Sequence, residues 1–312
     1  MKAPQRKLAV NGIDMAFVEQ GSGPLVLLCH GWPELSYSWR RQIPALAAAG
    51  YRVVAPDMRG YGETRAPEAI EAYSIFDLVG DMVALVDALG ERQAIVVGHD
   101  WGANVAWHCA LFRPDLFKAV AALSVPFGRR SAAPPLEILR RKGLETFYWL
   151  YFQPPGQAEA EFERDVDRTM RAAFYGRGVS LVMKPGKGFL EEAGIPAAPP
   201  AWLSEDDIAH YADVFRRTGF RGGLNWYRNL DRNWALTAPW QDAKIAPPAL
   251  FIAGSRDGVI SGPLGEARLK EMDGRIADLR GKLILDGAGH WIQQERAAEV
   301  NQALLAFLAE VR

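Results

Sequence analysis

Short apolar runs alternate with stretches of helical periodicity over the first 126 residues of the chain. Four of these runs have the length of a strand and are almost continuously apolar, which is typical of strands covered on both faces: Leu25–His30, Tyr51–Asp57, Ala94–His99 and Ala119–Val125. Between the second and third runs, apolar residues mark one face of a helix that is closed by a glycine: Ile75, Val79, Met82, Val86, Leu89 and then Gly90. This alternation predicts an α/β fold with a mostly parallel central sheet and flanking helices.

The pattern changes after about residue 130. Strand-like runs stop, and aromatic-rich helical stretches are broken by Pro154-Pro155, Pro185-Gly186 and Pro199-Pro200. These features predict an inserted helical cap, or lid, over residues 131–235. Inside it, the stretch from 176 to 202 is rich in Gly, Pro and Ala and predicts a long loop.

Strand patterning returns after the insertion. Residues Pro248–Gly254 and Lys282–Asp286 predict two more strands, and apolar residues spaced along 300–311 predict a last amphipathic helix. The predicted core is therefore discontinuous in sequence. We expect residues 1–130 and 236–312 to form it.

Composition narrows the functional classes. The 312 residues are 49% hydrophobic, enough for a large core, and 36 basic residues nearly balance 37 acidic ones without a block of like charge. This balance argues against a nucleic-acid partner. No apolar run reaches the roughly 18 residues of a membrane span, and residues 1–12 lack the apolar stretch of a signal peptide. We expect a cytoplasmic protein with no membrane partner, and the sequence leaves open whether it forms a homo-oligomer.

The two cysteines, Cys29 and Cys109, both lie in apolar segments. Two thiols cannot make a disulfide scaffold or a cysteine-rich zinc site. Both are predicted to be small core residues, and no metal site is predicted.

A candidate nucleophile lies where the run Ala94–His99 meets the next helix. The sequence Gly98-His-Asp-Trp-Gly102 has the spacing of a nucleophile elbow, with Asp100 in the nucleophile position. The backbone of such a turn is strained, and its glycines let strand and helix approach each other. Asp100 could equally be the N-cap of a helix that starts at Trp101, and the local sequence leaves both interpretations open.

Chain order suggests the partners of this nucleophile. Four of the five histidines end strands, lie within a helix or lie in the insertion, and are discounted as the base: His30, His99, His108 and His210. His290 follows the last strand on a Gly-rich loop, where the base of this architecture is expected. Asp257 lies at the end of an earlier strand and completes the order nucleophile, acid, histidine, although Asp257-Gly258 is also an ordinary turn dipeptide.

The loop after the first apolar run can complete the site. His30-Gly-Trp-Pro33 follows that run, and the backbone N–H of Trp32 can point at the elbow. Together with the N–H of Trp101 it would form an oxyanion hole. An ordinary strand-terminating turn is the alternative interpretation. The Trp32-Pro33 bond can be cis, as X-Pro bonds in tight turns sometimes are, although base rates favour trans.

Five motifs follow one another across most of the chain: His30-Gly-Trp-Pro-Glu34, Gly98-His-Asp-Trp-Gly102, Tyr148-Trp-Leu-Tyr-Phe-Gln-Pro-Pro155, Asn225-Trp-Tyr-Arg-Asn229 and Gly289-His-Trp291. Their combination resembles the soluble epoxide hydrolases of the α/β-hydrolase fold, although the first two also occur in related dehalogenases. The resemblance implies that Tyr148 and Tyr227 are cap tyrosines that donate hydrogen bonds to the epoxide oxygen. Spacing alone favours core aromatics of a helical lid at both positions.

Two stretches depart from the family pattern. The chain continues after Asp257 with Gly258-Val-Ile-Ser-Gly-Pro263, where family members more often have Val-Pro close behind the acid. Residues 176–215 match no family motif and are expected to shape the substrate pocket. We expect substrate contacts from aromatic and proline side chains within or beside the motifs: Trp32, Pro33, Trp101, Trp149 and Trp291.

The resemblance implies that water hydrolyses a small apolar epoxide to a vicinal diol, with no metal or organic cofactor. A carboxylate is already ionised at pH 7, so Asp100 would attack the ring without a base and form an alkyl ester. Tyr148 and Tyr227 would donate to the opening oxygen. His290, oriented by Asp257, would then activate water against the ester.

Two other functions remain open at this point. A haloalkane dehalogenase would use the same Asp and His, but it would commonly have Asn where this chain has Trp32. A non-catalytic receptor of the same fold would bind a small apolar ligand under the lid.

Overall fold

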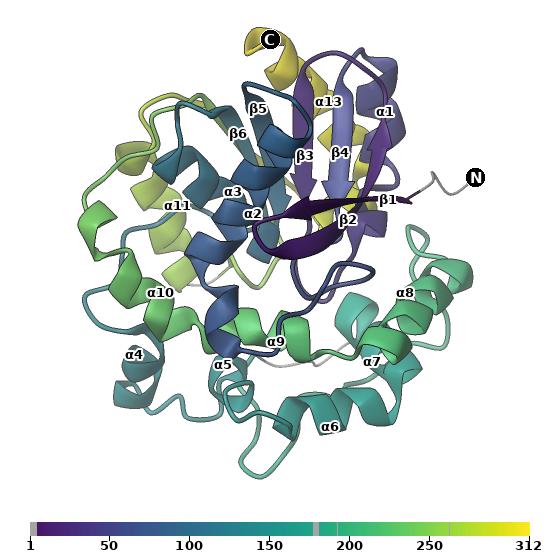
Figure 1. Ribbon diagram of the computed structural model, residues 1–312. Helices are drawn as coiled ribbons and strands as arrows, with labels where there is room; N and C mark the ends of the chain where they lie inside the picture. Colours follow the sequence, from purple (N-terminus) through teal and green to yellow (C-terminus); the bar gives the residue numbers. More distant parts are fainter. Residues whose placement is uncertain (1–4, 177–180, 192, 262) are drawn as a thin grey trace.

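The structure is a computed structural model, which describes residues 5–176, 181–191, 193–261 and 263–312. In this part of the chain eight strands form one sheet, in the order β1-β2-β4-β3-β5-β6-β7-β8 (Figure 1). Strands β3 to β8 pair in parallel, whereas β2 pairs antiparallel with both β1 and β4. The bounds are Gln5–Val10 (β1), Ile13–Gln20 (β2), Leu25–Cys29 (β3), Arg52–Pro56 (β4), Ala94–His99 (β5), Phe117–Leu123 (β6), Ala249–Gly254 (β7) and Leu279–Leu285 (β8). The predicted α/β fold with a mostly parallel sheet is confirmed.

The six predicted strands are β3 to β8, with ends shifted by a few residues. The hairpin of β1 and β2 was not predicted. Most of β1 is exposed, so it lacks the continuous apolar run of the central strands. Its signal is the turn Asn11-Gly12, where both residues have positive φ, at 44° and 79°.

Helices cover both faces of the sheet. Apolar residues of α1 (Gln42–Ala48) and α13 (Ala297–Glu310) pack on one face, and those of α2 (Ile75–Ala88) and α3 (Trp101–Phe112) pack on the other. The predicted helices α2 and α13 are confirmed, and a capping box between Ser74 and Asp77 starts α2. The remaining elements of this part are α11 (Pro263–Arg275), α12 (Ile292–Glu295) and the short 3₁₀ turns Ser36–Trp39, Ile70–Tyr73 and Ala238–Trp240. None of the described helices combines the length and apolar character that a membrane crossing requires.

Between β6 and β7 the described chain is helical, and Figure 1 shows these helices gathered beyond one end of the sheet. We call them the cap helices: α4 (Pro135–Arg141), α5 (Tyr148–Tyr151), α6 (Gln157–Arg164), α7 (Val166–Tyr175), α8 (Glu205–Thr218), α9 (Arg221–Arg228) and α10 (Leu230–Leu236). The domain boundaries given above stay a prediction. Within the predicted loop, residues 181–191 and 193–202 form turns and isolated bridges, and residues 177–180 and 192 lie outside the described residues.

Candidate active site

Asp100 lies in the turn between β5 and α3 with φ 53° and ψ −120°, a conformation that non-glycine residues rarely adopt. The flanking glycines allow this tight turn. A Cβ on Gly98 would overlap the carbonyl oxygen of Gly102, and a Cβ on Gly102 would overlap that of Cys29. The Asp100 carboxylate makes no capping hydrogen bond to α3, so capping does not account for it.

Three residues from distant parts of the chain meet beside this turn. His290, in the loop after β8, places Nε2 3.5 Å from Oδ2 of Asp100 and Nδ1 2.9 Å from Oδ2 of Asp257. Asp257 follows β7, its side chain is buried, and it also accepts a hydrogen bond from the N–H of Val259 at 2.8 Å. Among the described residues, no group of three or more His, Cys, Asp or Glu side chains could hold a metal ion.

The charges of these groups control one another's pKa values. Burial alone would lower the pKa of His290, but the charge of Asp257 and hydrogen bonds with Asp100 and Asp257 raise it well above its usual value. Burial would raise the pKa of Asp100, but the hydrogen bond and charge of His290 hold it below its usual value. The same opposition holds the pKa of Asp257 down. Both carboxylates are therefore ionised at neutral pH.

The loop after β3 contributes a backbone donor. The N–H of Trp32 donates to Oδ1 of Asp100 at 2.8 Å. Trp101 is the first residue of α3, and the first N–H groups of a helix have no partner within it. The Trp32-Pro33 bond is cis, so the expectation of a trans bond was wrong.

The two predicted tyrosines face this turn from the cap helices. Tyr148 begins α5 and Tyr227 lies in α9, and their ring centroids are 5.8 Å apart. The Tyr227 ring packs edge-on against Trp101 at 5.2 Å. Burial and the charge of Asp100 raise the pKa of Tyr148, and burial, Tyr148 and Asp100 raise that of Tyr227. Both hydroxyls therefore keep their protons at neutral pH and can act as donors.

The predicted substrate-contact residues surround these groups. The Trp32 ring lies 5.9 Å from Tyr227, and Pro33 beside it is buried. Trp149 lies 6.1 Å from Tyr148, and Trp291 lies 5.0 Å from His290. These ring contacts place the predicted substrate-contact residues directly beside the site groups.

A buried polar network behind His290 was missed by the sequence analysis. His99, discounted as a base, places Nε2 2.8 Å from the carbonyl oxygen of His290 and Nδ1 2.6 Å from Glu34. Ser124 donates to the same carbonyl oxygen at 2.8 Å. Both Glu34 and His99 lie within the sequence motifs described above, and this was the only sequence signal for their importance. Only the fold shows that they hold the backbone of His290.

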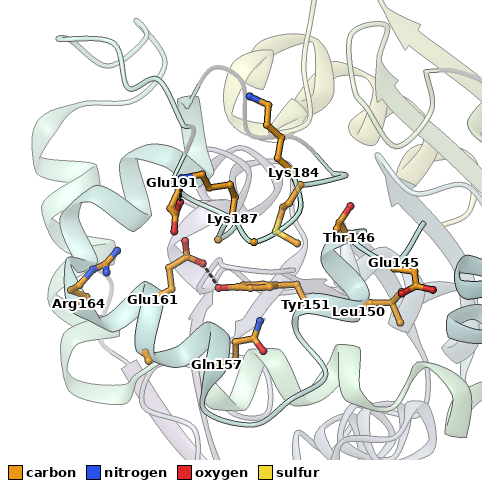
Figure 2. Close-up of a pocket in the computed structure, with 14 residues that line it drawn as sticks. Glu145, Thr146, Leu150, Tyr151, Gln157, Glu161, Arg164, Lys184, Lys187 and Glu191 are labelled. Carbon is orange, nitrogen blue, oxygen red and sulfur yellow. Dashed lines mark hydrogen bonds and ion pairs between the residues drawn. The ribbon is translucent and has the colours of Figure 1, made fainter. Parts of the chain in front are cut away.

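A hollow of about 580 Å³ lies on the cap helices. Figure 2 shows two of its lining residues, Tyr151 and Glu161, joined by a hydrogen bond. The described residues that line it include none of the predicted site residues. Glu161 accepts hydrogen bonds from Tyr151 Oη and from the N–H groups of Phe189 and Leu190, at 2.8 to 3.0 Å. The Phe189 ring lies 6.0 Å from the Tyr148 ring. The hydrogen bonds to Glu161 therefore hold an aromatic side chain beside a predicted site residue.

Proteins of similar sequence are known. A family model for the alpha/beta hydrolase fold matches residues 24–297. Epoxide hydrolase A of Mycobacterium tuberculosis is 48% identical over 99% of this chain and 98% of its own length. The chain belongs to the epoxide hydrolase family. It is 42% identical to an epoxide hydrolase of Caballeronia sordidicola over 97% of this chain and 93% of the relative.

Solved structures of this family superpose on the whole chain. Epoxide hydrolase A from Mycobacterium thermoresistibile gives a TM-score of 0.92 at 47% identity, covering 99% of this chain and 98% of that one. An epoxide hydrolase from Vigna radiata gives a TM-score of 0.94 at 42% identity, covering 98% of both chains. The chain is therefore an enzyme of the α/β-hydrolase fold.

Proposed function

We propose that this enzyme hydrolyses an epoxide to a vicinal diol through an alkyl ester on Asp100. The observation that supports it most is the placement of the Asp100 carboxylate, which lies on a strained elbow with His290 on one side. The phenols of Tyr148, which is partly buried, and of Tyr227, which is buried, lie on the cap helices, and the charge of Asp100 raises the pKa of both. In this proposal the site contains a nucleophile (Asp100), a base (His290) and two proton donors (Tyr148 and Tyr227).

In the first half-reaction an oxygen of Asp100 attacks a ring carbon, and the carbon–oxygen bond of the epoxide breaks. Oδ1 is held by the N–H of Trp32, so Oδ2 forms the new bond and Oδ1 becomes the ester carbonyl oxygen. The released alkoxide takes a proton from Tyr148 or Tyr227. No base is needed, because the low pKa of Asp100 keeps it ionised.

In the second half-reaction His290 takes a proton from water, and the resulting hydroxide attacks the ester carbonyl carbon. The oxyanion forms on Oδ1, where the N–H groups of Trp32 and Trp101 stabilise it. The tetrahedral carbon then releases the diol, which keeps the former Oδ2 and takes the proton from His290. The proton that the attacking hydroxide leaves on the Asp100 carboxyl group returns to the tyrosine that gave its proton in the first half-reaction. The sum is one epoxide and one water to one diol.

The alternatives rank lower. The similar proteins named above are epoxide hydrolases. The two phenols also suit an alkoxide better than a halide, because a leaving halide needs no proton.

A single turnover in ¹⁸O-water tests the path of oxygen. Because water attacks the carbonyl carbon, label should enter the peptide that contains Asp100, and the first diol should carry an unlabelled enzyme oxygen. Mass spectrometry of the digest and of the diol measures both. Label in the first diol would mean that water attacks the epoxide directly, and the role of Asp100 would be wrong.

The pH dependence of the second half-reaction gives another prediction. Esterification removes the charge of Asp100, one of the influences that raise the pKa of His290. The pKa of His290 should therefore be lower in the ester than in the free enzyme. Below it, we expect the rate of ester hydrolysis to fall about tenfold per pH unit, because the base must be unprotonated. Single-turnover rates across pH, compared with NMR titration of the free enzyme, measure both values.

The variant Asp257→Asn sharpens that prediction. Asp257 supplies the largest influence that raises the pKa of His290, so the midpoint of the profile should move to lower pH. The plateau rate should also fall, because the imidazole loses its orienting partner. A midpoint that stays in place would show that a group other than His290 controls this step.

A further inference from the structure

The two site tyrosines lie on separate short helices that approach each other only in the folded chain. Helix α5 spans Tyr148–Tyr151 and is a single turn. One isolated turn of helix is unstable, and its last carbonyl groups need donors from elsewhere. Contacts between α5 and α9 therefore contribute to the position of Tyr148 relative to Tyr227, together with the hydrogen bond from the N–H of Tyr148 to the carbonyl oxygen of Leu181.

One contact runs from the end of α5 to α9. The side-chain Nε2 of Gln153 donates to the carbonyl oxygen of Trp149 at 2.7 Å and to that of Tyr227 at 3.2 Å. One amide group thus joins the residue after Tyr148 to Tyr227 itself. Gln153 lies in the motif that begins at Tyr148, but the chemistry proposed above does not use it.

A second contact runs in the opposite direction. Arg228, next to Tyr227, donates through Nε to the carbonyl oxygens of Phe152 at 3.1 Å and Gln153 at 3.3 Å. These carbonyls lie at the C-terminus of α5, where a cation is favourable. The Arg228 side chain is 2% exposed, and its charge pairs with Glu159 of α6 at 2.8 Å.

We propose that Gln153 and Arg228 are positioning residues that hold α5 and α9 in register, so that the two tyrosine hydroxyls meet the same oxygen atom of the substrate. This inference rests on the proposed function of the tyrosines. Gln153, just after α5, donates to the backbone of Tyr227, and Arg228 of α9 donates to the backbone just after α5. We call this pair of residues the reciprocal clasp. Loss of either contact lets α5 shift, and catalysis is sensitive to misplacement of a reacting group by about 1 Å.

Gln153→Met is the main test, because it keeps the length of the side chain and removes the amide. Arg228 is a poorer choice, since breaking its buried pair leaves Glu159 unpaired and threatens folding. We expect ring opening, measured as the single-turnover rate of ester formation, to slow by about tenfold. Hydrolysis of the preformed ester depends on His290 and water and should keep its rate.

Three further variants define the result. Gln153→Glu places a carboxylate against two carbonyl oxygens and should slow ring opening more than Gln153→Met. Gln302→Met makes the same chemical change at an exposed position of α13, outside the cap helices, and should leave both steps unchanged. In a Tyr227→Phe background, Gln153→Met should slow ring opening less than twofold further, because the second hydroxyl that it aligns is already gone. Thermal unfolding confirms that each variant is folded.

The outcomes separate this inference from the function on which it rests. If Tyr227→Phe alone leaves ring opening unchanged, the proposed role of the tyrosines fails. If Tyr227→Phe slows ring opening but Gln153→Met does not, the clasp is overturned and the tyrosines stand. Equal slowing of both half-reactions, or full additivity with Tyr227→Phe, would show a general structural role and would also overturn it.

Discussion

His290→Gln is expected to form the ester on Asp100 and to stop there. The first half-reaction needs no base, because Asp100 is already ionised, whereas the second needs His290 to take a proton from water. Loss of a general base typically slows the step that it serves by about 10² to 10⁴-fold, so the ester should accumulate. Intact mass spectrometry should show the protein heavier by one whole substrate molecule.

The double variant of His290→Gln with Asp100→Asn is the matched control. It lacks the nucleophile, so its mass should stay unchanged after the same incubation. A digest of the single variant should place the added mass on the peptide that contains Asp100. If His290→Gln binds substrate but gains no mass, the ester mechanism is wrong.

Removing both cap phenols is expected to abolish nearly all turnover of epoxides. Two donors to one oxygen partly replace each other, so Tyr148→Phe and Tyr227→Phe should each lower turnover less than their combination. For the double variant we expect a loss of about 10² to 10⁴-fold, the usual contribution of general acid catalysis. Steady-state diol formation by the three variants measures this.

The fold should survive, because the changes remove only hydroxyl groups. Tyr51→Phe is a suitable control, since Tyr51 is buried in the core on the opposite face of the sheet from α2 and α3. A haloalkane provides a second comparison, because halide release needs no proton and should not depend on the phenols. A folded double variant that still hydrolyses epoxides would remove the tyrosines from the mechanism.

Local pattern was sufficient for most of the core. Continuous apolar runs predicted β3 to β7, because strands covered on both faces leave few polar positions. The short run Lys282–Asp286 predicted β8, although this strand lies at the edge of the sheet and alternates between partly buried and exposed residues. Helical spacing and Gly90 predicted α2. The hairpin of β1 and β2 escaped this approach, since strand β1 at the edge of the sheet is exposed and its residues carry no such run.

The site residues also differ in whether the local sequence alone could identify them. Asp100 was recognisable because a strained turn demands small neighbours at fixed spacing, and that demand is local. The role proposed for Tyr148 and Tyr227 came from resemblance alone, because a lid tyrosine and a core tyrosine have the same helical spacing. The motifs also contain Gln153, Arg228, Glu34 and His99. Each of these residues has a hydrogen-bond partner far away in the chain.

The sequence by itself determined the class of fold and the six strands β3 to β8, and it supplied candidate residues for the chemistry of a hydrolase, because hydrophobic period and turn geometry are local properties. The tertiary structure alone decided that His290 lies between Asp100 and Asp257, that Trp32 donates to Asp100, and that α5 and α9 share the reciprocal clasp. Hydrogen bonds and charges act only over a few ångströms. Which groups come that close depends on how the sheet and cap helices pack, and no short stretch of sequence contains that information.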